Sequence, residues 1–338
     1  MLGGKYMINF DENDFLERGS YIYDRKNKLI EMADAVCKKG FSNIFFSSVG
    51  GSQAMMDPFK TMIEEMSDIP VYSVLSSTLV YTGCKQLNKD SVVFMSSKSG
   101  DTKETVRAAE YIKKIGCTII SAVGKDNSPL EALSDYCFVY GDGRPQELIM
   151  YILVGRILMN KGYFDSFPKF LDELKNLPQV LCDVRVQADN QAKEYCQKYC
   201  NEPYNIWIAS GNLWPVCYAY AMCVLEESQW IRTKSVSSPE FFHGTLELVE
   251  KDVCCTLLIG EGKTREIDLR VKDFIEEYSD KANVFDTKDY PYVGISDEFR
   301  DILSPVVMNA ILQRISKNME VITNHSLEIR RYYRKVKY

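Results

Sequence analysis

The sequence predicts an α/β protein of two tandem, doubly wound parallel sheets joined by helices. The 338 residues are too many for one small domain and suit two. Short apolar strands without polar alternation are separated by helical patterns, which is typical of parallel sheets covered on both faces. One strand sequence also occurs twice, since Asn43-Ile-Phe-Phe-Ser-Ser48 and Asn205-Ile-Trp-Ile-Ala-Ser210 are 162 residues apart (205 − 43). Gly100-Asp-Thr-Lys-Glu104 and Gly262-Lys-Thr-Arg-Glu266 have the same offset, which indicates a duplicated domain.

Each copy is expected to alternate strands and helices. The first has predicted strands at 43–48, 71–75, 91–96, 117–123 and 136–140, with helices at 54–66, 103–115 and 146–161. The second has predicted strands at 204–210, 254–259 and 282–285. Between them the sequence looks helical, with only Pro168 and Pro178 as breaks. We therefore expect an N-terminal domain at 1–164, a helical connector at 165–198, a C-terminal domain at 199–325 and a tail at 326–338.

Composition argues against several classes of protein. The 41 basic and 47 acidic residues give a net charge of −6, so neither nucleic acid nor an anionic membrane is an expected partner. No apolar run reaches the roughly 18–20 residues of a membrane span, and no secretory signal is recognised. Eleven cysteines without a Cys-x-x-Cys motif predict free thiols in a reducing cytoplasm. Only His243 and His325 are present, which argues against a multi-histidine zinc site, and no metal or other cofactor is expected.

Hydroxyl side chains gather after the strand predicted at 91–96. Ser96-Ser-Lys-Ser-Gly-Asp-Thr102 precedes a helix, and ligands of open parallel sheets bind beyond the carboxyl ends of the strands. The helix there offers unpaired N–H groups and its positive dipole end, which suit a phosphate dianion. An ordinary helix cap explains one or two hydroxyls, but not four. The equivalent Ile259-Gly-Glu-Gly-Lys263 has no serine and adds a carboxylate, so only the first copy is expected to bind an anion.

These motifs resemble the sugar isomerase (SIS) domain family, which binds phosphosugars. Ser97-Lys-Ser-Gly-Asp-Thr102 is similar to its Ser-x-Ser-Gly-Glu/Asp-Thr signature, and Ser48-Val-Gly-Gly-Ser52 resembles its earlier strand-end motif. The resemblance covers nearly the whole chain as two flavodoxin-like SIS domains. It implies a phosphate cradle formed by Ser52, Ser97, Lys98 (through its backbone), Ser99 and Thr102, with Gly51 as a further substrate contact.

One carboxylate and one histidine are predicted to carry acid–base chemistry. The helical pattern from Pro215 ends in Glu226-Glu227, where two carboxylates oppose the helix dipole. In the double-SIS isomerases and deglycases, a catalytic glutamate at this helix end precedes a His-Gly by 16 residues. Glu227 and His243 fit that spacing (243 − 227). The resemblance implies that Glu227 moves a proton between sugar carbons C1 and C2, while His243 assists ring opening. The alternatives are a buried structural histidine and a solvated helix-end charge.

The C-terminal tail, together with residue 224, indicates which members of the family the chain resembles most. Glucosamine-6-phosphate synthases carry a glutaminase domain and a lysine one turn before the glutamate; here that position is Val224. The chain looks closer to the fructosamine-type deglycases, which cleave 6-phosphorylated Amadori compounds. Its ending, with Arg331 and Tyr333 as expected substrate contacts, resembles their tail. An alternative for this segment is a frayed basic end.

The predicted function is release of glucose 6-phosphate and a free amino acid or amine from a 6-phosphorylated Amadori compound. Two alternatives stay open: deamination or isomerisation of a simple amino-sugar 6-phosphate, and a non-catalytic phosphosugar sensor. A serine hydrolase is disfavoured, because Gly50-x-Ser52-x-Ala54 only partly matches a nucleophile elbow. The resemblance also implies at least a homodimer, in which His243 acts in its own or a neighbouring subunit's site.

Overall fold

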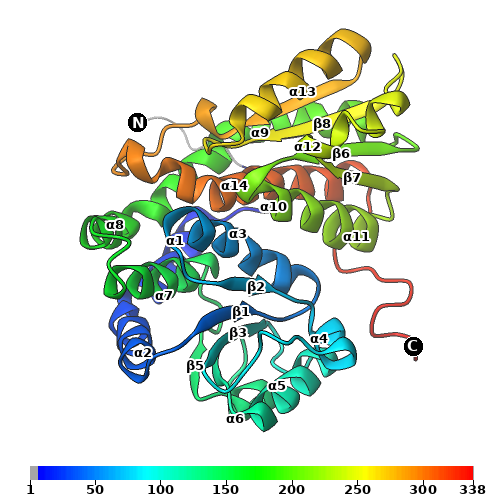
Figure 1. Ribbon diagram of the computed structural model, residues 1–338. Helices are drawn as coiled ribbons and strands as arrows, with labels where there is room; N and C mark the ends of the chain where they lie inside the picture. Colours follow the sequence, from blue (N-terminus) through cyan, green and yellow to red (C-terminus); the bar gives the residue numbers. More distant parts are fainter. Residues whose placement is uncertain (1–6, 338) are drawn as a thin grey trace. The chain divides into compact units, whose positions relative to one another are not determined.

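The computed structural model describes residues 7–337, which divide into two compact units (Figure 1). One unit is Asp14–Pro178, and the other contains residues 7–13 together with 179–337. The predicted connector at 165–198 forms α8 (Phe167–Glu173), the short helix η1 (Leu174–Asn176) and most of α9 (Leu177–Tyr199). The units divide at Pro178, inside this helical stretch. The domain limits at 164, 198 and 325 stay predictions.

The unit Asp14–Pro178 is built on a five-stranded parallel sheet in the order β2-β1-β3-β4-β5. Its strands are β1 (Asn43–Phe46), β2 (Val71–Ser73), β3 (Ser91–Ser97), β4 (Thr118–Val123) and β5 (Tyr136–Val139). All residues of β1, β3 and β4 are buried, which explains why these strands are apolar without alternation. This strand order is that of a doubly wound, flavodoxin-like sheet.

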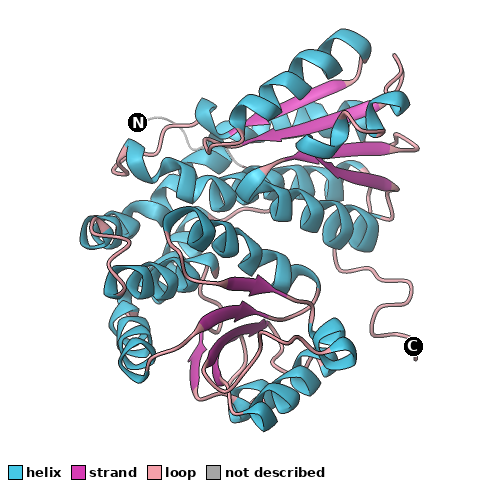
Figure 2. Cartoon of the chain, viewed as in Figure 1, coloured by secondary structure: helices cyan, strands magenta, loops and turns pink. Residues whose placement is uncertain are grey.

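Helices cover both faces of this sheet (Figure 2). They are α1 (Glu12–Asp24), α2 (Lys26–Lys39), α3 (Gly50–Met66), α4 (Ser76–Thr82), α5 (Lys103–Ile115), α6 (Pro129–Leu133), α7 (Glu147–Asn160) and α8. On one face, Phe45 and Val93 pack with Ile112 of α5 in a buried apolar cluster. Elsewhere in this unit, Phe59 of α3 meets Tyr151 of α7 edge to face, 4.8 Å between ring centroids. Helix α7 is apolar all round because it is buried almost throughout.

The second unit repeats the arrangement with four parallel strands in the order β7-β6-β8-β9. They are β6 (Asn205–Ala209), β7 (Thr233–Ser237), β8 (Cys254–Ile259) and β9 (Ala282–Asp286). The strands β6, β7, β8 and β9 hold the places of β1, β2, β3 and β4, which agrees with the 162-residue duplication. Parallel sheets in both units confirm the predicted fold class.

The second unit also carries helices on both faces of its sheet (Figure 2). They are α9, η2 (Gly211–Leu213), α10 (Trp214–Ala219), η3 (Tyr220–Glu226), α11 (Glu227–Gln229), α12 (Ser238–Phe241), η4 (Thr245–Leu248), α13 (Arg265–Tyr278), η5 (Thr287–Asp289), η6 (Asp297–Phe299) and α14 (Arg300–Ile322). Ile208 and Leu257 pack with Val271 of α13 in one apolar cluster. The ring of Trp207 contacts Tyr195 of α9, with 6.0 Å between centroids.

Among residues 7–337, no helix combines the length and apolar content needed to cross a membrane. The same residues contain no group of three or more histidine, cysteine, aspartate or glutamate side chains placed to hold a metal ion. All eleven cysteines are free thiols.

Candidate active site

The carboxyl ends of β1 and β3 form the switch point of the first sheet. The chain passes from β1 to the edge strand β2, and from β3 to β4 and β5 on the opposite side. The loops that follow two such strands diverge and leave a crevice, where ligands of doubly wound sheets bind. The β1 loop leads into α3 and the β3 loop into α5, so both helices direct N–H groups and a positive dipole end toward this edge. Every phosphate contact predicted from the sequence lies at these two connections.

Ser97, Gly100 and Thr102 hold the loop after β3 in one shape. Ser97 is buried, and its Oγ lies 3.0 Å from Thr102 Oγ1 and accepts the N–H of Gly100 at 3.0 Å. Gly100 has φ +68°, and a Cβ there would lie 2.3 Å from the Cβ and Oγ of Ser128. Glycine alone combines this backbone conformation with so close an approach. The structure therefore brings two of the predicted hydroxyls together around Gly100.

Lys98 and Ser99 lie at the tip of the same loop. The side chain of Lys98 is exposed, while its carbonyl accepts the N–H of Gly124 at 3.2 Å. Ser99 is half-buried, and its hydroxyl donates to the carboxylate of Asp101. What Lys98 contributes to the shape of the loop is therefore its backbone.

Gly51 and Ser52 lie in the first turn of α3, at the end of β1. Gly51 is exposed and Ser52 is half-buried. The connection is fixed by the buried Gln53, whose Oε1 accepts the N–H of Ser48 at 2.5 Å. The Ser48 hydroxyl in turn donates to the carbonyl of Ser96 at 2.8 Å. The ends of β1 and β3 are thus held side by side, which places the two predicted parts of the cradle at one edge.

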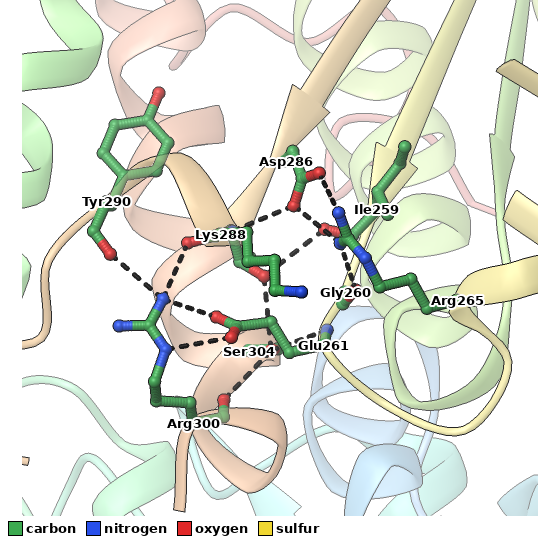
Figure 3. A network of polar contacts seen from close by, with 10 residues as sticks. Ile259, Gly260, Glu261, Arg265, Asp286, Lys288, Tyr290, Arg300 and Ser304 are labelled. Atoms are coloured by element: carbon green, nitrogen blue, oxygen red, sulfur yellow. Dashed lines mark hydrogen bonds and ion pairs between the residues drawn. The ribbon is translucent and has the colours of Figure 1, made fainter. Parts of the chain in front are cut away.

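At the equivalent edge of the second sheet, charged side chains are paired with one another within their own unit. Arg300 at the start of α14 forms an ion pair with Glu261 at 2.7 Å, and also donates to the carbonyl of Tyr290 at 3.1 Å (Figure 3). Arg265 at the start of α13 pairs with Asp286 at 2.6 Å (Figure 3). Both arginines are therefore neutralised by internal partners.

An internal carboxylate completes this second edge. Asn212, in the loop after β6, donates to the carboxylate of Asp301 at 3.0 Å. A Cβ at Gly262, in the loop after β8, would lie 2.5 Å from Asp301 Oδ1. The Asp301 carboxylate therefore sits close to the loop that precedes α13, where a helix N-terminus favours negative charge.

Glu227 is placed by a helix that changes its winding. The connection after β6 runs through α10, the π-helical segment η3 and a last short turn, α11. A π-helical segment closes hydrogen bonds one residue further along than an α-helix does, and such segments are frequent at functional sites. Glu227 directly follows η3, and its side chain is 34% exposed. The helix stops at Trp230, which has a left-handed backbone with φ +60°.

The C-terminal tail lies against this helix end. Gln229 Nε2 donates to the carbonyl of His325 at 2.9 Å, and the His325 ring meets Trp230 edge to face at 4.3 Å. Arg330 Nε donates to Glu227 Oε1 at 2.7 Å. The guanidinium of Arg331 stacks over the Trp230 ring, 3.8 Å from its centroid. Glu227 is thus held in a partly exposed ion pair with the tail.

An open pocket of about 640 Å³ surrounds Glu227 in this unit. Its walls come from the helix end, from the start of β7 and from the tail, and include Glu226, Trp230, Arg232, Arg331 and Tyr333. The predicted contacts Arg331 and Tyr333 are therefore brought to the predicted catalytic carboxylate. Arg330 was not expected from the tail sequence; its position beside Arg331 in an Arg-Arg pair is the signal that could have pointed to it.

His243 does not line this pocket. It follows α12, is exposed, and donates its backbone N–H to the carbonyl of Glu240 at 3.0 Å. Its exposure excludes a buried structural histidine. Within one chain, the structure therefore joins Glu227 to the tail without placing His243 in the same pocket.

A buried carboxylate supports the segment that carries His243. Asp268 of α13 is 1% exposed and accepts a hydrogen bond from Ser238 Oγ, at the start of α12, at 2.5 Å. Burial raises the pKa of Asp268 to about 6, although hydrogen bonds from Ser238 and Ser210 act to lower it. Arg265 favours the ionised form of Asp268 and Asp286 opposes it.

Comparison with known proteins places the chain in a family. A model of the SIS domain matches residues 39–150. Fructosamine deglycase FrlB of Bacillus subtilis strain 168 is 30% identical over 312 residues, which cover 89% of this chain and 94% of the relative. The chain belongs to the SIS-domain family of this deglycase. Fructoselysine 6-phosphate deglycase of Escherichia coli strain K12 is 23% identical to this SIS-family chain over 305 residues, 89% of it and 88% of the relative.

Solved structures agree with this family. A Bacillus subtilis protein described as a phosphosugar isomerase has a TM-score of 0.87 and 28% identity, with 92% of this chain and 97% of that chain covered. The C-terminal domain of glucosamine-fructose-6-phosphate aminotransferase from Francisella tularensis, at 18% identity, shares the fold with a TM-score of 0.78. This SIS-family protein is therefore an enzyme of the phosphosugar deglycase and isomerase type.

Proposed function

We propose that this SIS-family enzyme is a deglycase that hydrolyses 6-phosphorylated Amadori compounds to glucose 6-phosphate and a free amino acid or amine. The observation that carries the proposal is the hydroxyl-rich turn Ser97–Thr102 at the β1/β3 switch point; at the matching edge of the second sheet, Arg265 and Arg300 are already paired with carboxylates. The 30% identity to a fructosamine deglycase over 94% of that protein supports the reaction class.

The phosphate is proposed to bind at the ends of β1 and β3. Its ligands are the hydroxyls and N–H groups of Ser52, Ser97, Lys98 (backbone), Ser99 and Thr102, with Gly51 leaving room for the sugar. Two helix N-termini at this edge favour a dianion. Phosphate is remote from the reacting carbons, so its binding energy serves to position them.

Glu227 is proposed to move the proton that the reaction requires. It removes a proton from C1 of the open-chain ketosamine, which gives a 1,2-enaminol, and the proton returns at C2 to give a C1 imine. Water then adds to C1, the C1–N bond breaks, and the amine leaves as the aldehyde of glucose 6-phosphate forms. One water is consumed per turnover, and the substrate's own carbonyl and imine accept the electrons. A positioned carboxylate contributes about 10²–10⁴-fold in such a step.

His243 is proposed to open the sugar ring and to protonate the leaving amine, because histidine is the side chain that most often acts as a general acid and base. Its exposed position, away from the pocket of Glu227, supports a homodimer or higher homo-oligomer in which His243 serves a neighbouring subunit's site. Size-exclusion chromatography with light scattering tests the oligomer; a monomer at assay concentration would contradict it.

The enzyme is also proposed to work in the cytoplasm. Eleven free cysteines suit a reducing compartment, and several are buried with raised pKa, as for Cys117 at about 11. Fractionation of the source cells tests this location.

The decisive experiment measures glucose 6-phosphate release from a panel of 6-phosphorylated Amadori compounds. Glu227→Gln and His243→Asn should each lower kcat by about 10²–10⁴-fold while the proteins keep their fold. Folded variants that retain full turnover would contradict the assigned roles. Release from glucosamine 6-phosphate, with none from the panel, would instead support a deaminase acting on a simple amino-sugar phosphate. Binding of phosphosugars without turnover would support a sensor.

A further inference from the structure

Three arginines line the pocket beside Glu227, and one of them pairs with this carboxylate. Arg330 is bound to Glu227 itself at 2.7 Å. Arg331, in the tail, and Arg232, just before β7, line the same pocket. Among residues 7–337, neither of these two guanidinium groups has a carboxylate partner. The pocket therefore carries positive charge that the described part of the chain does not neutralise.

The environment of Arg331 leaves its donors available. Its guanidinium stacks over the Trp230 ring, so the contact uses the flat face of the group. The N–H groups lie in the guanidinium plane and remain free for an acceptor at its edge. Arginine held in this way matches the two oxygens of a carboxylate in a bidentate pair.

Trp230 is itself fixed from two sides. Its other ring contact is with His325, at 4.3 Å, and its neighbour Gln229 bonds the His325 carbonyl at 2.9 Å. Trp230 stands three residues after Glu227 on the same helix end. The platform under Arg331 is therefore built into the element that carries the proposed catalytic carboxylate.

The two carboxylates that line the pocket, Glu226 and Glu227, have partners other than Arg331 and Arg232. Glu227 pairs with Arg330, and Glu226 accepts a hydrogen bond from the hydroxyl of Thr233. A ligand group that meets Arg331 and Arg232 must then be an acceptor with negative charge. The phosphate of the proposed substrate has its own ligands in the loops after β1 and β3, which leaves a second anionic group of the substrate to be recognised here.

We propose that Arg331 and Arg232 form a carboxylate subsite that binds the carboxylate of the amino acid released by the enzyme. This inference rests on the proposed deglycase function and narrows its substrate class to Amadori compounds of amino acids. The amine nitrogen is bonded to C1, where Glu227 acts. The carboxylate of an amino acid linked through its α-amine is therefore only a few bonds from the reacting carbon.

The test compares two substrates that differ in one charge, the 6-phosphorylated Amadori compounds of glycine and of glycinamide. Wild-type enzyme should show kcat/KM at least about tenfold higher for the glycine compound, the size expected for hydrogen bonds to a charged group. Arg331→Met and Arg232→Met should each raise KM for the glycine compound about tenfold. The same variants should lower kcat/KM for the glycinamide compound much less, so that the ratio of the two kcat/KM values falls toward one.

Arg331→Lys and Lys335→Met are the matched variants. Lysine keeps the charge but loses the planar pair of donors, so Arg331→Lys should recover only part of the preference. Lys335 is an exposed tail residue that does not line the pocket, so Lys335→Met should behave as wild type. Circular dichroism and melting temperature establish that each variant is folded.

The results of this experiment distinguish failure of the carboxylate subsite from failure of the proposed deglycase reaction. Equal kcat/KM for both compounds, or an equal loss on both in the arginine variants, overturns the subsite and leaves the deglycase function intact. Absence of glucose 6-phosphate from both compounds with wild-type enzyme overturns the deglycase function, and the subsite with it.

Discussion

Arg330 Nε lies 2.7 Å from Glu227 Oε1, so the tail of the chain is tied to the carboxylate for which we propose catalysis. The same guanidinium donates to the carbonyls of Leu327 and Ile329, at 2.6 and 2.9 Å. The tail is thereby folded around its own arginine. Because Arg330 holds the Glu227 carboxylate, we expect it to position Glu227 for the substrate.

Replacement of Arg330 should affect turnover more than stability. We expect Arg330→Met to lower kcat about tenfold with KM changed less than about twofold, because Glu227 loses the group that orients it. Arg330→Lys should recover part of kcat. Since the pair is partly exposed, the melting temperature should fall by no more than about 4 °C. Steady-state kinetics and thermal melts measure this, with Lys335→Met as control; unchanged kcat would contradict the positioning role.

Removal of single hydroxyls from the β1/β3 edge should weaken phosphate binding. We expect Ser52→Ala and Ser99→Ala each to raise KM for a phosphorylated substrate about tenfold or more, because a hydrogen bond to a charged group is worth about 1.5–3 kcal/mol. Ser20→Ala, on the exposed side of α1, should leave KM unchanged. Competition by inorganic phosphate gives an independent readout. If both variants bind phosphate as wild type does, the cradle is wrongly placed.

Ionisation of Asp268 should lower the free energy of unfolding as the pH rises from about 4 to about 6. Its pKa is raised from 3.8 to about 6 in the fold, so the native state binds the proton more tightly than the unfolded state does. The resulting stabilisation is complete below pH 3.8 and is lost as the pH rises through about 6, a change of up to about 3 kcal/mol. Asp268→Asn, which keeps an acceptor for Ser238, should remove this dependence. Urea unfolding of the wild-type protein and of Asp268→Asn at pH 4.5 and pH 7.5 measures this dependence. If the free energy of unfolding changes equally with pH in both proteins, Asp268 is not its source.

Co-expression of two inactive variants should report where His243 acts. In a dimer that shares His243 between subunits, a Glu227→Gln chain paired with a His243→Asn chain contains one intact site. Random pairing then gives about one quarter of wild-type activity. If His243 serves its own chain, every site lacks one group and activity stays at background. Each variant expressed alone is the control.

The sequence allowed the buried strands to be predicted closely because burial on both faces makes them apolar. The helix predicted at 103–115 and the strand at 254–259 coincide with α5 and β8. The edge strand β7 was missed, because Thr233–Ser237 has one buried apolar residue, Val236. An edge strand pairs on one side only and tolerates polar residues, so it lacks the apolar run. Helix α3 begins at Gly50, earlier than the predicted residue 54, because its first turn is polar and small.

The site could be predicted only where chemistry is concentrated in short motifs. The hydroxyls from Ser97 to Thr102 are adjacent in sequence, and the β3 loop brings them together locally. The contact of Arg330 with Glu227 joins residues 103 positions apart and depends on the path of the tail after α14. No local pattern encodes such a path. The role of Trp230 as a platform is equally non-local, since its partners His325 and Arg331 belong to the tail.

The Asp301 carboxylate beside Gly262 has a consequence for the history of the two halves. Serines introduced at 259–263 would not by themselves create a second phosphate site, because a dianion would meet the negative charge of Asp301. Arg265 and Arg300 would not compensate, since Asp286 and Glu261 already neutralise them. Several charges would have to change together before any one change became useful. The two halves of the chain have therefore taken on different roles. No single substitution would give the second half the phosphate site of the first.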